Sequence, residues 1–315
     1  ANDVRVPILQ KAGLKVHILP FGGPIDIFTP WKLGRIIRDF SPVIVQTWMS
    51  RAAQKTPNWK DTKTPQRYLV VSRVGGYYKV RHFKNSDYFV TITPDLKRIL
   101  MEGGLKEHHI RFINNFAETE AVGTPLRKAD LGTPENAPVL LALGRLHVNK
   151  AHDILIKAVA ELPGVYAWIA GEGPARGELE QLARELNVTD RVKFLGWRTD
   201  RAALLQACDV CTLISRVEAF GTVFAQSWAQ QTPVIVSDAD GPRQFCRNGE
   251  DSLVVPKNDV SALVQAVNKL LSDPALRQKL VENGHARYRN EFTKEASVGA
   301  YSEYFIEILK QEKIL

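Results

Sequence analysis

Short apolar runs alternate with longer amphipathic segments along almost the whole sequence. The apolar runs are rich in Val, Ile and Leu, as at 139–143 and 210–214. Strands of this kind are buried on both faces, as happens in parallel sheets that helices cover on both sides. The alternation therefore predicts an α/β fold of doubly wound parallel sheets.

The expected elements follow from this pattern. In the first part of the chain we expect strands at 15–19, 43–46, 68–71, 88–92 and 111–113, and helices at 30–39 and 94–103. In the second part we expect strands at 139–143, 165–170, 192–195, 210–214, 233–236 and 253–255, and helices at 154–161, 175–186, 202–207, 222–230 and 261–271. The tail after Asp273 is expected to be helical, with an apolar stripe through Val298, Tyr301, Tyr304, Phe305 and Ile308.

A stretch at 123–138, GTPLRKADLGTPENAP, has the Pro- and Gly-rich composition of a linker. We expect one domain at 1–130, a second at 131–290, and a final helix at 291–315 that packs back towards the first domain. The first residues read as the end of a helix that leads into a strand. No earlier strand and Gly-rich turn precede them, and the chain starts with Ala, so we expect a trimmed chain or a minimal variant.

The net charge of +8 is unevenly distributed. Residues 1–130 hold 21 basic and 11 acidic residues, whereas 131–315 hold 21 and 23. Asp61 is the one acid in 51–84, against nine bases: Arg51, Lys55, Lys60, Lys63, Arg67, Arg73, Lys79, Arg81 and Lys84. Two interpretations stay open. The first half meets an anionic membrane, a phosphorylated substrate or nucleic acid, or it is a merely soluble basic face. The sequence contains no nucleic-acid-binding motif that would support nucleic acid as the anionic partner.

Several classes of protein are excluded. No run of about 18 apolar residues suggests a membrane span, and no secretion signal opens the chain. Cys208, Cys211 and Cys246 are too few for a disulfide framework and suit a reducing compartment. The CDVC motif at 208–211 runs into a predicted buried strand, so we expect two buried thiols. The histidines show no metal-ligand spacing, and DAD at 238–240 reads as a capping turn.

The loop after the strand at 139–143 carries Arg145 and Lys150 and leads into a helix. Ligands of open α/β sheets bind beyond the carboxyl ends of strands, where helix N-termini offer free N–H groups. Arginine grips phosphate bidentately and lysine supplies a point charge, so the loop suits a diphosphate. It is neither a Walker loop nor a GxGxxG turn. Two solvated basic side chains remain the alternative.

A second loop contains Glu218, a turn at Gly221 and a helix start at Thr222, with Gln226 eight residues after Glu218. Glu218 can accept hydrogen bonds from sugar hydroxyls, and the Gln226 amide can reach a ribose diol. Alternatively, Glu218 is an acid at a helix start that the helix dipole favours, and Gln226 is a surface amide. WIAGEGP at 168–174 and FLGWRTD at 194–200 also end strands with glycine and can present backbone groups to a nucleotide base.

These four loops, in this order, resemble glycosyltransferase family 4, the retaining, nucleotide-sugar-dependent enzymes with the GT-B fold. The matching pieces include GRLHVNKAHDILIKA and CTLISRVEAFGTVFAQSWAQQTPVIVSD, and they cover 139–272, with a weaker match at 86–116. The resemblance implies two facing Rossmann-like domains, the second holding the donor. It also implies a catalytic set of Glu218, Arg145 and Lys150. The implied donor-binding residues are Gly144, His147, Gly171, Trp197, Arg198, Phe220, Gly221, Thr222 and Gln226, with Phe220 to Thr222 acting through their backbone.

The chain departs from the family hallmark, E-x7-E, because Gln226 replaces the second acid. A neutral amide keeps the length and the hydrogen-bonding capacity but loses charge-assisted strength. If the second acid serves ribose binding, the donor site is modestly weaker and the chemistry is retained. If that acid is a base, activity collapses. We favour the first expectation.

The first domain is similar to family members that build lipopolysaccharide core or other envelope glycans in Gram-negative bacteria. The segments that carry this likeness are QTWMSRAA and RVGGYYKVRHFKNSDYF, with Gln46 and Trp48 where many relatives have a histidine. The resemblance makes this the acceptor-side domain. Arg73, Tyr77, Tyr78 and Lys79 are expected to face the interdomain cleft and to suit a phosphorylated or acidic glycolipid.

The resemblance thus implies hexosyl transfer from a nucleoside-diphosphate sugar to an envelope glycan or lipid-linked acceptor, with retention of anomeric configuration. We expect no cofactor and no metal, because Arg145, Lys150 and helix dipoles can stabilise the departing diphosphate. The expected location is the cytoplasm, peripherally on the inner face of the bacterial inner membrane. A donor-binding fragment or pseudoenzyme, and a nucleotide-sugar epimerase, stay open as alternatives.

Overall fold

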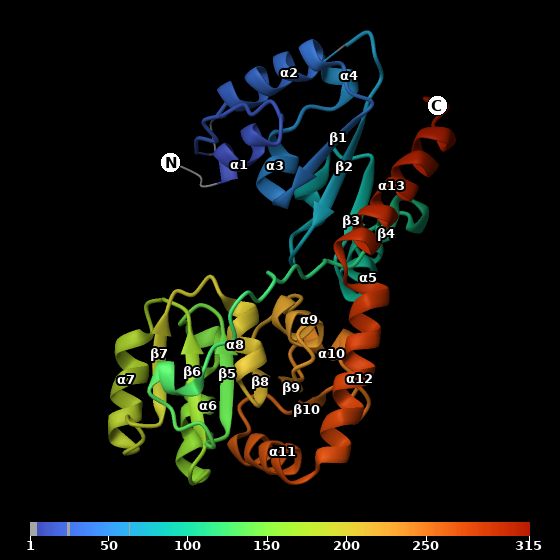
Figure 1. Ribbon diagram of the computed structural model, residues 1–315. Coiled ribbons are helices and arrows are strands. Elements are labelled where there is room, and N and C mark those ends of the chain that lie inside the picture. Colours follow the sequence, from blue (N-terminus) through green and yellow to red (C-terminus); the bar gives the residue numbers. More distant parts are fainter. Residues whose placement is uncertain (1–4, 24–25, 63) are drawn as a thin grey trace. The chain divides into compact units, whose positions relative to one another are not determined.

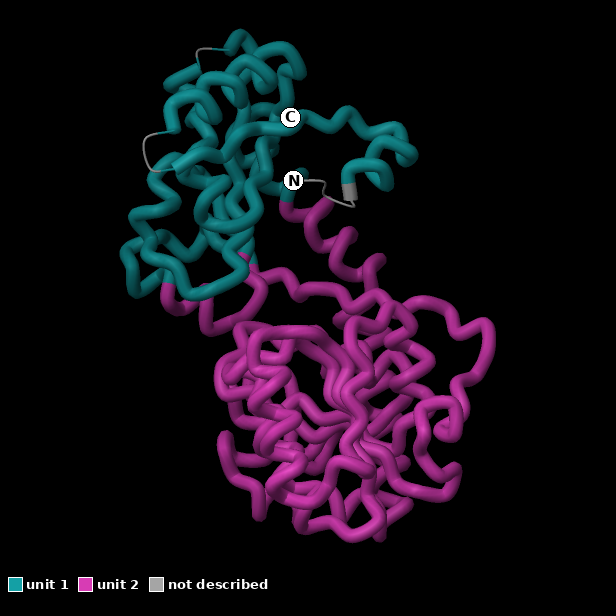
Figure 2. Tube along the Cα trace, turned by 90° about the vertical axis from the view of Figure 1, so that its left-hand side faces the viewer, with its two compact units in different colours: residues 1–90, 100–111, 305–315 teal, residues 91–99, 112–304 magenta. Residues whose placement is uncertain are grey.

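The computed structural model describes residues 5–23, 26–62 and 64–315, which form two compact units. Unit 1 is built from Ala1–Val90, Leu100–Arg111 and Phe305–Leu315, and unit 2 from Thr91–Ile99 and Phe112–Tyr304 (Figure 2). Helix α13 (Lys294–Gln311) therefore contributes its first part to unit 2 and its last part to unit 1.

Unit 1 contains a four-stranded sheet in the order β1-β2-β3-β4. Its strands are β1 (Ile44–Trp48), β2 (Leu69–Val74), β3 (Tyr88–Thr91) and β4 (Ile110–Phe112). The accompanying helices and turns are α1 (Arg5–Lys11), α2 (Phe28–Phe40), α3 (Met49–Lys55), α4 (Trp59–Thr62), η1 (Val80–Phe83) and η2 (Glu107–His109). Helix α5 (Pro94–Glu102) belongs to unit 2 as far as Ile99 and to unit 1 from Leu100 on. Strands β1 and β2 run parallel and pair Trp48 with Arg73, so both strands end at the same edge.

The prediction of a strand at 15–19 is wrong. Helix α1 is present as the sequence indicated, but residues 14–20 have no regular structure. None of the four strands of the unit 1 sheet pairs with this segment, and Ile18 is 80% exposed. Because no neighbouring strand is available, the backbone N–H and C=O groups of this segment cannot form sheet hydrogen bonds. The apolar residues of the segment are therefore not enough to make it a strand.

Unit 2 contains a six-stranded parallel sheet (Figure 1). Its strands are β5 (Val139–Leu143), β6 (Tyr166–Ala170), β7 (Val192–Gly196), β8 (Val210–Leu213), β9 (Val234–Ser237) and β10 (Leu253–Val255), close to the predicted positions. The spatial order is β10-β9-β8-β5-β6-β7. Strands β6 and β7 follow β5 on one side of the sheet, and β8, β9 and β10 follow one another on the other side. The direction of winding reverses between β5 and β8, which is therefore the topological switch point.

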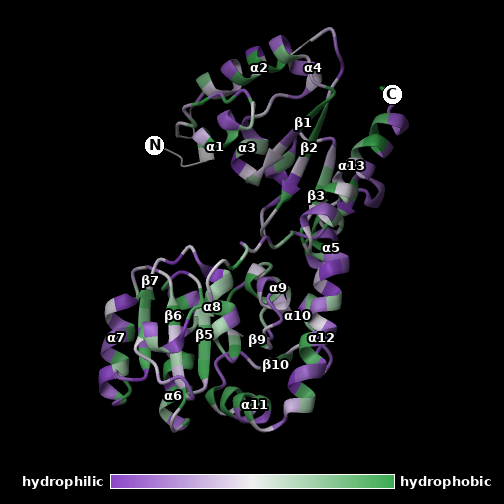
Figure 3. Ribbon diagram, viewed as in Figure 1, coloured by the Kyte–Doolittle hydropathy of each residue, from purple (hydrophilic) through white to green (hydrophobic). Residues whose placement is uncertain are grey.

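Helices cover both faces of this sheet. They are α6 (His152–Glu161), α7 (Arg176–Glu185), α8 (Arg201–Ala207), α9 (Thr222–Ala229), α10 (Pro242–Phe245), α11 (Val260–Ser272) and α12 (Pro274–Glu291), with short turns η3 (Lys128–Leu131) and η4 (Val148–Lys150). Leu140 of β5 is buried in one core with side chains of α6, α7 and α11, and Leu141 in another with α8 and α9. Strands that serve two cores are apolar throughout, as Figure 3 shows for β5.

The predicted helical tail consists of two helices, α12 and α13. Within the expected apolar stripe, Tyr304 and Ile308 are buried, whereas Val298 is exposed. Across the described ranges, no helix combines the length and the apolar character needed to cross a membrane.

Candidate functional site

The loops that follow β5 and β8 meet at the switch point of the unit 2 sheet. This is the place where open α/β sheets bind ligands. Lys150 from the first loop and Glu218 from the second form an ion pair, in which both side chains are largely shielded from solvent. Ser215 Oγ also donates to Glu218 Oε2 at 3.4 Å. The structure therefore brings two of the three predicted catalytic residues into contact.

Arg216 ties these two loops together, a role that the sequence did not reveal. Its guanidinium donates to both oxygens of Asp153, at 2.8 and 2.7 Å, and to the Val148 carbonyl at 2.7 Å. Its backbone amide donates to the Asn149 carbonyl at 2.8 Å. Because Asp153 lies in the first turn of α6, these bonds fix the β8 loop against the start of that helix.

Glycines allow the loops to approach one another closely. The Gly144 amide donates to the Ala170 carbonyl at 3.0 Å, and a Cβ atom on Gly171 would lie 1.9 Å from the Gly144 carbonyl oxygen. Behind the Glu218 loop, the Gly241 amide donates to the Glu218 carbonyl at 2.8 Å. A Cβ atom at position 241 would lie 2.7 Å from the Phe220 amide nitrogen, so the loop has no space to move in that direction.

A cavity of about 280 Å³ opens beside the switch point. Six predicted site residues line it: Gly144, Arg145, Gly171, Trp197, Arg198 and Gln226. Arg198 is held in place by Asp200 through two hydrogen bonds, at 2.8 and 2.5 Å. Gln226 is 6% exposed, whereas Trp197 is 78% exposed and forms the outer wall. A largely buried amide at the wall of a cavity contradicts the alternative that Gln226 is a surface residue.

The cavity is also lined by Arg201 and Val223, which the sequence did not reveal, and by Thr199 of the predicted 194–200 segment. Val223 lies three residues before Gln226 on α9, so helical spacing would have placed both on one face. Thr199 and Arg201 follow β7 at the same edge of the sheet. The strand-end rule that found Trp197 and Arg198 applies equally to them.

His147, expected beside the donor, lines a separate cavity, and its Nδ1 accepts from the Asn149 amide at 3.2 Å. His152 is buried next to this loop, and burial lowers its pKa to about 4, so its ring is neutral at pH 7. The Phe220 side chain is buried against Phe224, so only its backbone is available to a ligand. Gly221 caps α9 with φ 88°, and Thr222 begins that helix.

The predicted residues of unit 1 gather where β1 and β2 end. The Arg73 guanidinium lies 4.5 Å from the centre of the Trp48 ring, in a cation–π contact. The Tyr78 hydroxyl donates to Met49 Sδ at 3.5 Å. Tyr77 is exposed, and Lys79 stands immediately before η1. The four predicted residues thus share one edge of the unit 1 sheet.

The signals set aside in the sequence have structural explanations. Cys208 and Cys211 are buried, and burial raises the pKa of both thiols, to about 12 for Cys211. Asp238 Oδ1 accepts from the Lys257 amide at 2.9 Å, and Asp240 pairs with Arg243, so DAD organises a turn. In the part of the chain that the structure describes, no three His, Cys, Asp or Glu side chains are grouped as metal ligands.

Comparisons with known proteins identify the family of the chain. The family model described as "Glycosyl transferases group 1" matches residues 124–287. A curated Rhizobium meliloti (strain 1021) protein, "Lipopolysaccharide core biosynthesis glycosyltransferase LpsE", is 37% identical over 276 residues, covering 87% of this chain and 79% of its own length.

Two solved structures share the fold. A glycosyltransferase from Rickettsia africae ESF-5 superposes with a TM-score of 0.84 at 19% identity, over 98% of this chain and 89% of its own. Anabaena HepE, solved with UDP and glucose, gives 0.81 at 19% identity, over 100% and 90%. These likenesses confirm the expected GT-B fold class.

Proposed function

The chain belongs to the glycosyl transferases group 1 family and is a glycosyltransferase, and on that premise we propose that it is a retaining, family 4-type hexosyltransferase. Its donor is a nucleoside-diphosphate sugar and its acceptor an envelope glycan or a lipid-linked glycan. The observation that carries the proposal is the Lys150–Glu218 pair at the switch point, next to the cavity lined by Arg145 and Gln226.

The donor cavity suits a nucleotide. Arg145 supplies a guanidinium for the diphosphate at the end of β5, and Gln226 supplies an amide for the ribose. The cavity volume of about 280 Å³ matches a nucleotide better than a whole nucleotide sugar. The hexose would then extend towards Glu218 and Gly221. We take UDP as the first candidate nucleotide, since Anabaena HepE was solved with UDP and glucose.

The proposed mechanism is one of placement and electrostatic stabilisation. An acceptor hydroxyl oxygen bonds to the anomeric carbon on the face from which the diphosphate leaves, the bond from that carbon to the diphosphate breaks, and the hydroxyl proton passes to the departing phosphate oxygen. Arg145 and Lys150 stabilise the negative charge that develops on the leaving group. Glu218 orients the sugar by accepting hydrogen bonds from its hydroxyls. The tied loops hold these groups in one arrangement, which is the main source of rate enhancement in this scheme.

The acceptor is proposed to meet unit 1 at the edge formed by Trp48, Arg73, Tyr77, Tyr78 and Lys79. Aromatic rings suit the apolar faces of sugars, and cations suit acidic or phosphorylated groups. The lipopolysaccharide-core name of the Rhizobium relative supports an envelope glycan as the acceptor. A peripheral position on the inner face of the membrane is part of the same proposal.

The first test is calorimetric titration of the purified chain with UDP, GDP and ADP. We expect one nucleotide to bind selectively, and Arg145→Ala to raise its Kd about tenfold or more, because a charge-assisted phosphate contact is lost. Binding of no nucleotide would remove the donor site from the proposal. Incubation with the matching sugar nucleotide, with and without acceptor, separates transfer from epimerisation.

Restoring the second acid tests the role of position 226. Gln226→Glu is expected to lower the Kd for UDP about two- to fivefold, because a ribose contact becomes charge-assisted, and to leave kcat within about a factor of two. Gln265→Glu on the exposed side of α11 adds the same charge elsewhere and is the control. A rise in kcat of several orders of magnitude would instead identify position 226 as a catalytic base.

A further inference from the structure

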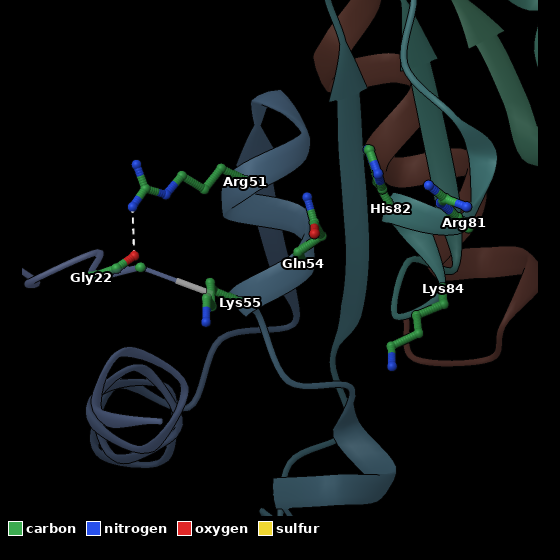
Figure 4. Close-up of a pocket in the computed structure, with 8 residues that line it drawn as sticks. Gly22, Arg51, Gln54, Lys55, Arg81, His82 and Lys84 are labelled. Atoms are coloured by element: carbon green, nitrogen blue, oxygen red, sulfur yellow. Dashed lines mark hydrogen bonds between the residues drawn. The ribbon is translucent and has the colours of Figure 1, made fainter. Parts of the chain in front are cut away.

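A second cavity, of about 740 Å³, lies within unit 1 (Figure 4). Its side-chain walls are Arg51, Gln54 and Lys55 of α3, Arg81 and His82 of η1, and the adjacent Lys84. Neither aspartate nor glutamate is present among its described lining residues. Four formal positive charges therefore surround one space.

The walls of this cavity are held by the core of unit 1. Helix α3 follows β1, and η1 follows the neighbouring parallel strand β2. Ala53 of α3 and Phe83 of η1 are buried in the same cluster, and the Phe83 ring meets Phe89 edge-on with ring centres 6.2 Å apart. The apolar side chains point inwards, so the basic side chains of both elements are left on the cavity side.

Among the described residues, the basic side chains of the cavity form hydrogen bonds to backbone carbonyls but no ion pair with a carboxylate. Arg51 Nη2 donates to the Gly22 carbonyl at 2.6 Å, and Lys55 Nζ donates to the Asp26 carbonyl at 2.7 Å, which are neutral acceptors. Over the described parts of the chain, Arg51, Lys55, Arg81 and Lys84 form no ion pair with a carboxylate. Hydrogen bonds from Thr29 and the positive charge of Lys55 lower the pKa of the Asp26 carboxylate, so Lys55 is partly balanced by a carboxylate without a direct ion pair.

His82 adds an unused polar group to the same wall. Its Nδ1 atom is buried and has no hydrogen-bond partner among the described residues. A buried polar atom without a partner costs free energy, so such atoms often mark the place of a missing ligand or water. Because protein atoms enclose this ring nitrogen, the groups that the cavity offers to a ligand are the guanidinium and ammonium groups.

We infer that this cavity binds a phosphate monoester group, carried by a sugar or by a lipid headgroup. A phosphate monoester has a charge of about −1.5 to −2 and three acceptor oxygens, whereas a carboxylate has one charge and two oxygens. Four cations are better matched by the phosphate, and arginine can bind it bidentately. The cavity is larger than a phosphate, which leaves room for part of the carrier. This inference goes beyond the proposed function, because it stands whether or not unit 2 transfers a sugar.

The test is calorimetric titration of the full chain with glucose 6-phosphate, with glucose as the uncharged comparison. The Arg145→Ala background is used because this substitution is expected to weaken phosphate binding by the donor cavity. We expect saturable binding of glucose 6-phosphate only, weakened at least tenfold by the double substitution Arg81→Ala and Lys84→Ala. The matched control is Lys32→Ala with Lys60→Ala, which removes the same charge from exposed positions of unit 1 outside the cavity and should change the Kd less than about twofold.

Vesicles distinguish the two carriers. Sedimentation with phosphatidylcholine vesicles is compared with and without phosphatidic acid, for the same variants. A lipid carrier is supported if the chain binds phosphatidic-acid vesicles but not glucose 6-phosphate, and the Arg81 and Lys84 variant loses that vesicle binding. A phosphorylated glycan is supported if the chain binds glucose 6-phosphate but not the vesicles, and the variant loses the sugar-phosphate binding. No saturable binding to either probe, or equal losses in the control variant, overturns the inference. UDP titration in parallel, with Arg145 intact, reports separately on the donor site.

Discussion

Replacing Lys150 with alanine is expected to lower kcat/KM for sugar transfer about 10²–10³-fold. Two effects add up. The substitution removes a cation proposed to stabilise the departing diphosphate, where one lost electrostatic contact typically costs this much. It also leaves the largely buried Glu218 carboxylate without its ion-pair partner. The measurement is initial-rate kinetics with the nucleotide sugar that the titrations identify.

The control for this prediction is Lys157→Ala, which removes the same charge from an exposed position on α6. It should leave kcat/KM within about a factor of two, since it lies outside both loops at the switch point. Lys150→Arg keeps the charge and is expected to recover part of the activity. Thermal unfolding of each variant separates loss of chemistry from loss of structure. A fall of less than about threefold for Lys150→Ala would show that this lysine has no part in leaving-group stabilisation.

Gly171→Ala is expected to lower the free energy of unfolding by about 3 kcal/mol and to abolish nucleotide binding. The new Cβ atom would lie 1.9 Å from the Gly144 carbonyl oxygen, which is a backbone atom and cannot rotate away. Overpacking of this kind costs about 1–3 kcal/mol, and the backbone clash places this case at the upper end. The two loops must separate, and both line the donor cavity. Urea unfolding and UDP titration measure the two effects.

Gly177→Ala provides the matched control for this prediction. It adds the same methyl group to a glycine inside α7, where a Cβ atom would meet nothing within 4 Å. Because alanine is the better helix former, we expect a gain in stability of about 0.5–1 kcal/mol and unchanged UDP binding. Equal effects at the two positions would mean that the close approach of the loops is not a structural requirement.

The strands of unit 2 were predictable because each lies between two cores. A run such as 139–143 is apolar at every position, and few other environments favour that composition. The prediction failed at 15–19, where Lys15 and His17 interrupt the apolar residues and no neighbouring strand pairs with the segment. Helix α3 was not predicted because it is short and buries only Ala53, so its sequence has no apolar stripe at helical spacing.

The candidate site was predictable as far as chain topology determines it. Arg145, Lys150 and Glu218 follow strand ends, and parallel strands end at one edge, so local sequence was enough to group them. The hydrogen bonds that hold these loops were not predictable, because they join residues far apart in the sequence. Arg216 donates to Asp153, and the Gly241 amide donates to the Glu218 carbonyl. In the same way, the nine basic residues left an anionic partner and a merely soluble basic face both open, and only the pairing of β1 with β2 shows that Arg51, Lys55, Arg81 and Lys84 line one cavity.

The Arg216 bonds and the glycine contacts have a consequence for affinity. Fixing the backbone of one residue costs about 1–2 kcal/mol of conformational entropy. The loops after β5 and β8 are already tied together by their own hydrogen bonds, so this cost is met when the chain folds rather than when the donor arrives. A preorganised site of this kind gains affinity without any further contact to its ligand. Loosening Arg216 would therefore weaken binding even though its guanidinium is engaged with Asp153 and Val148.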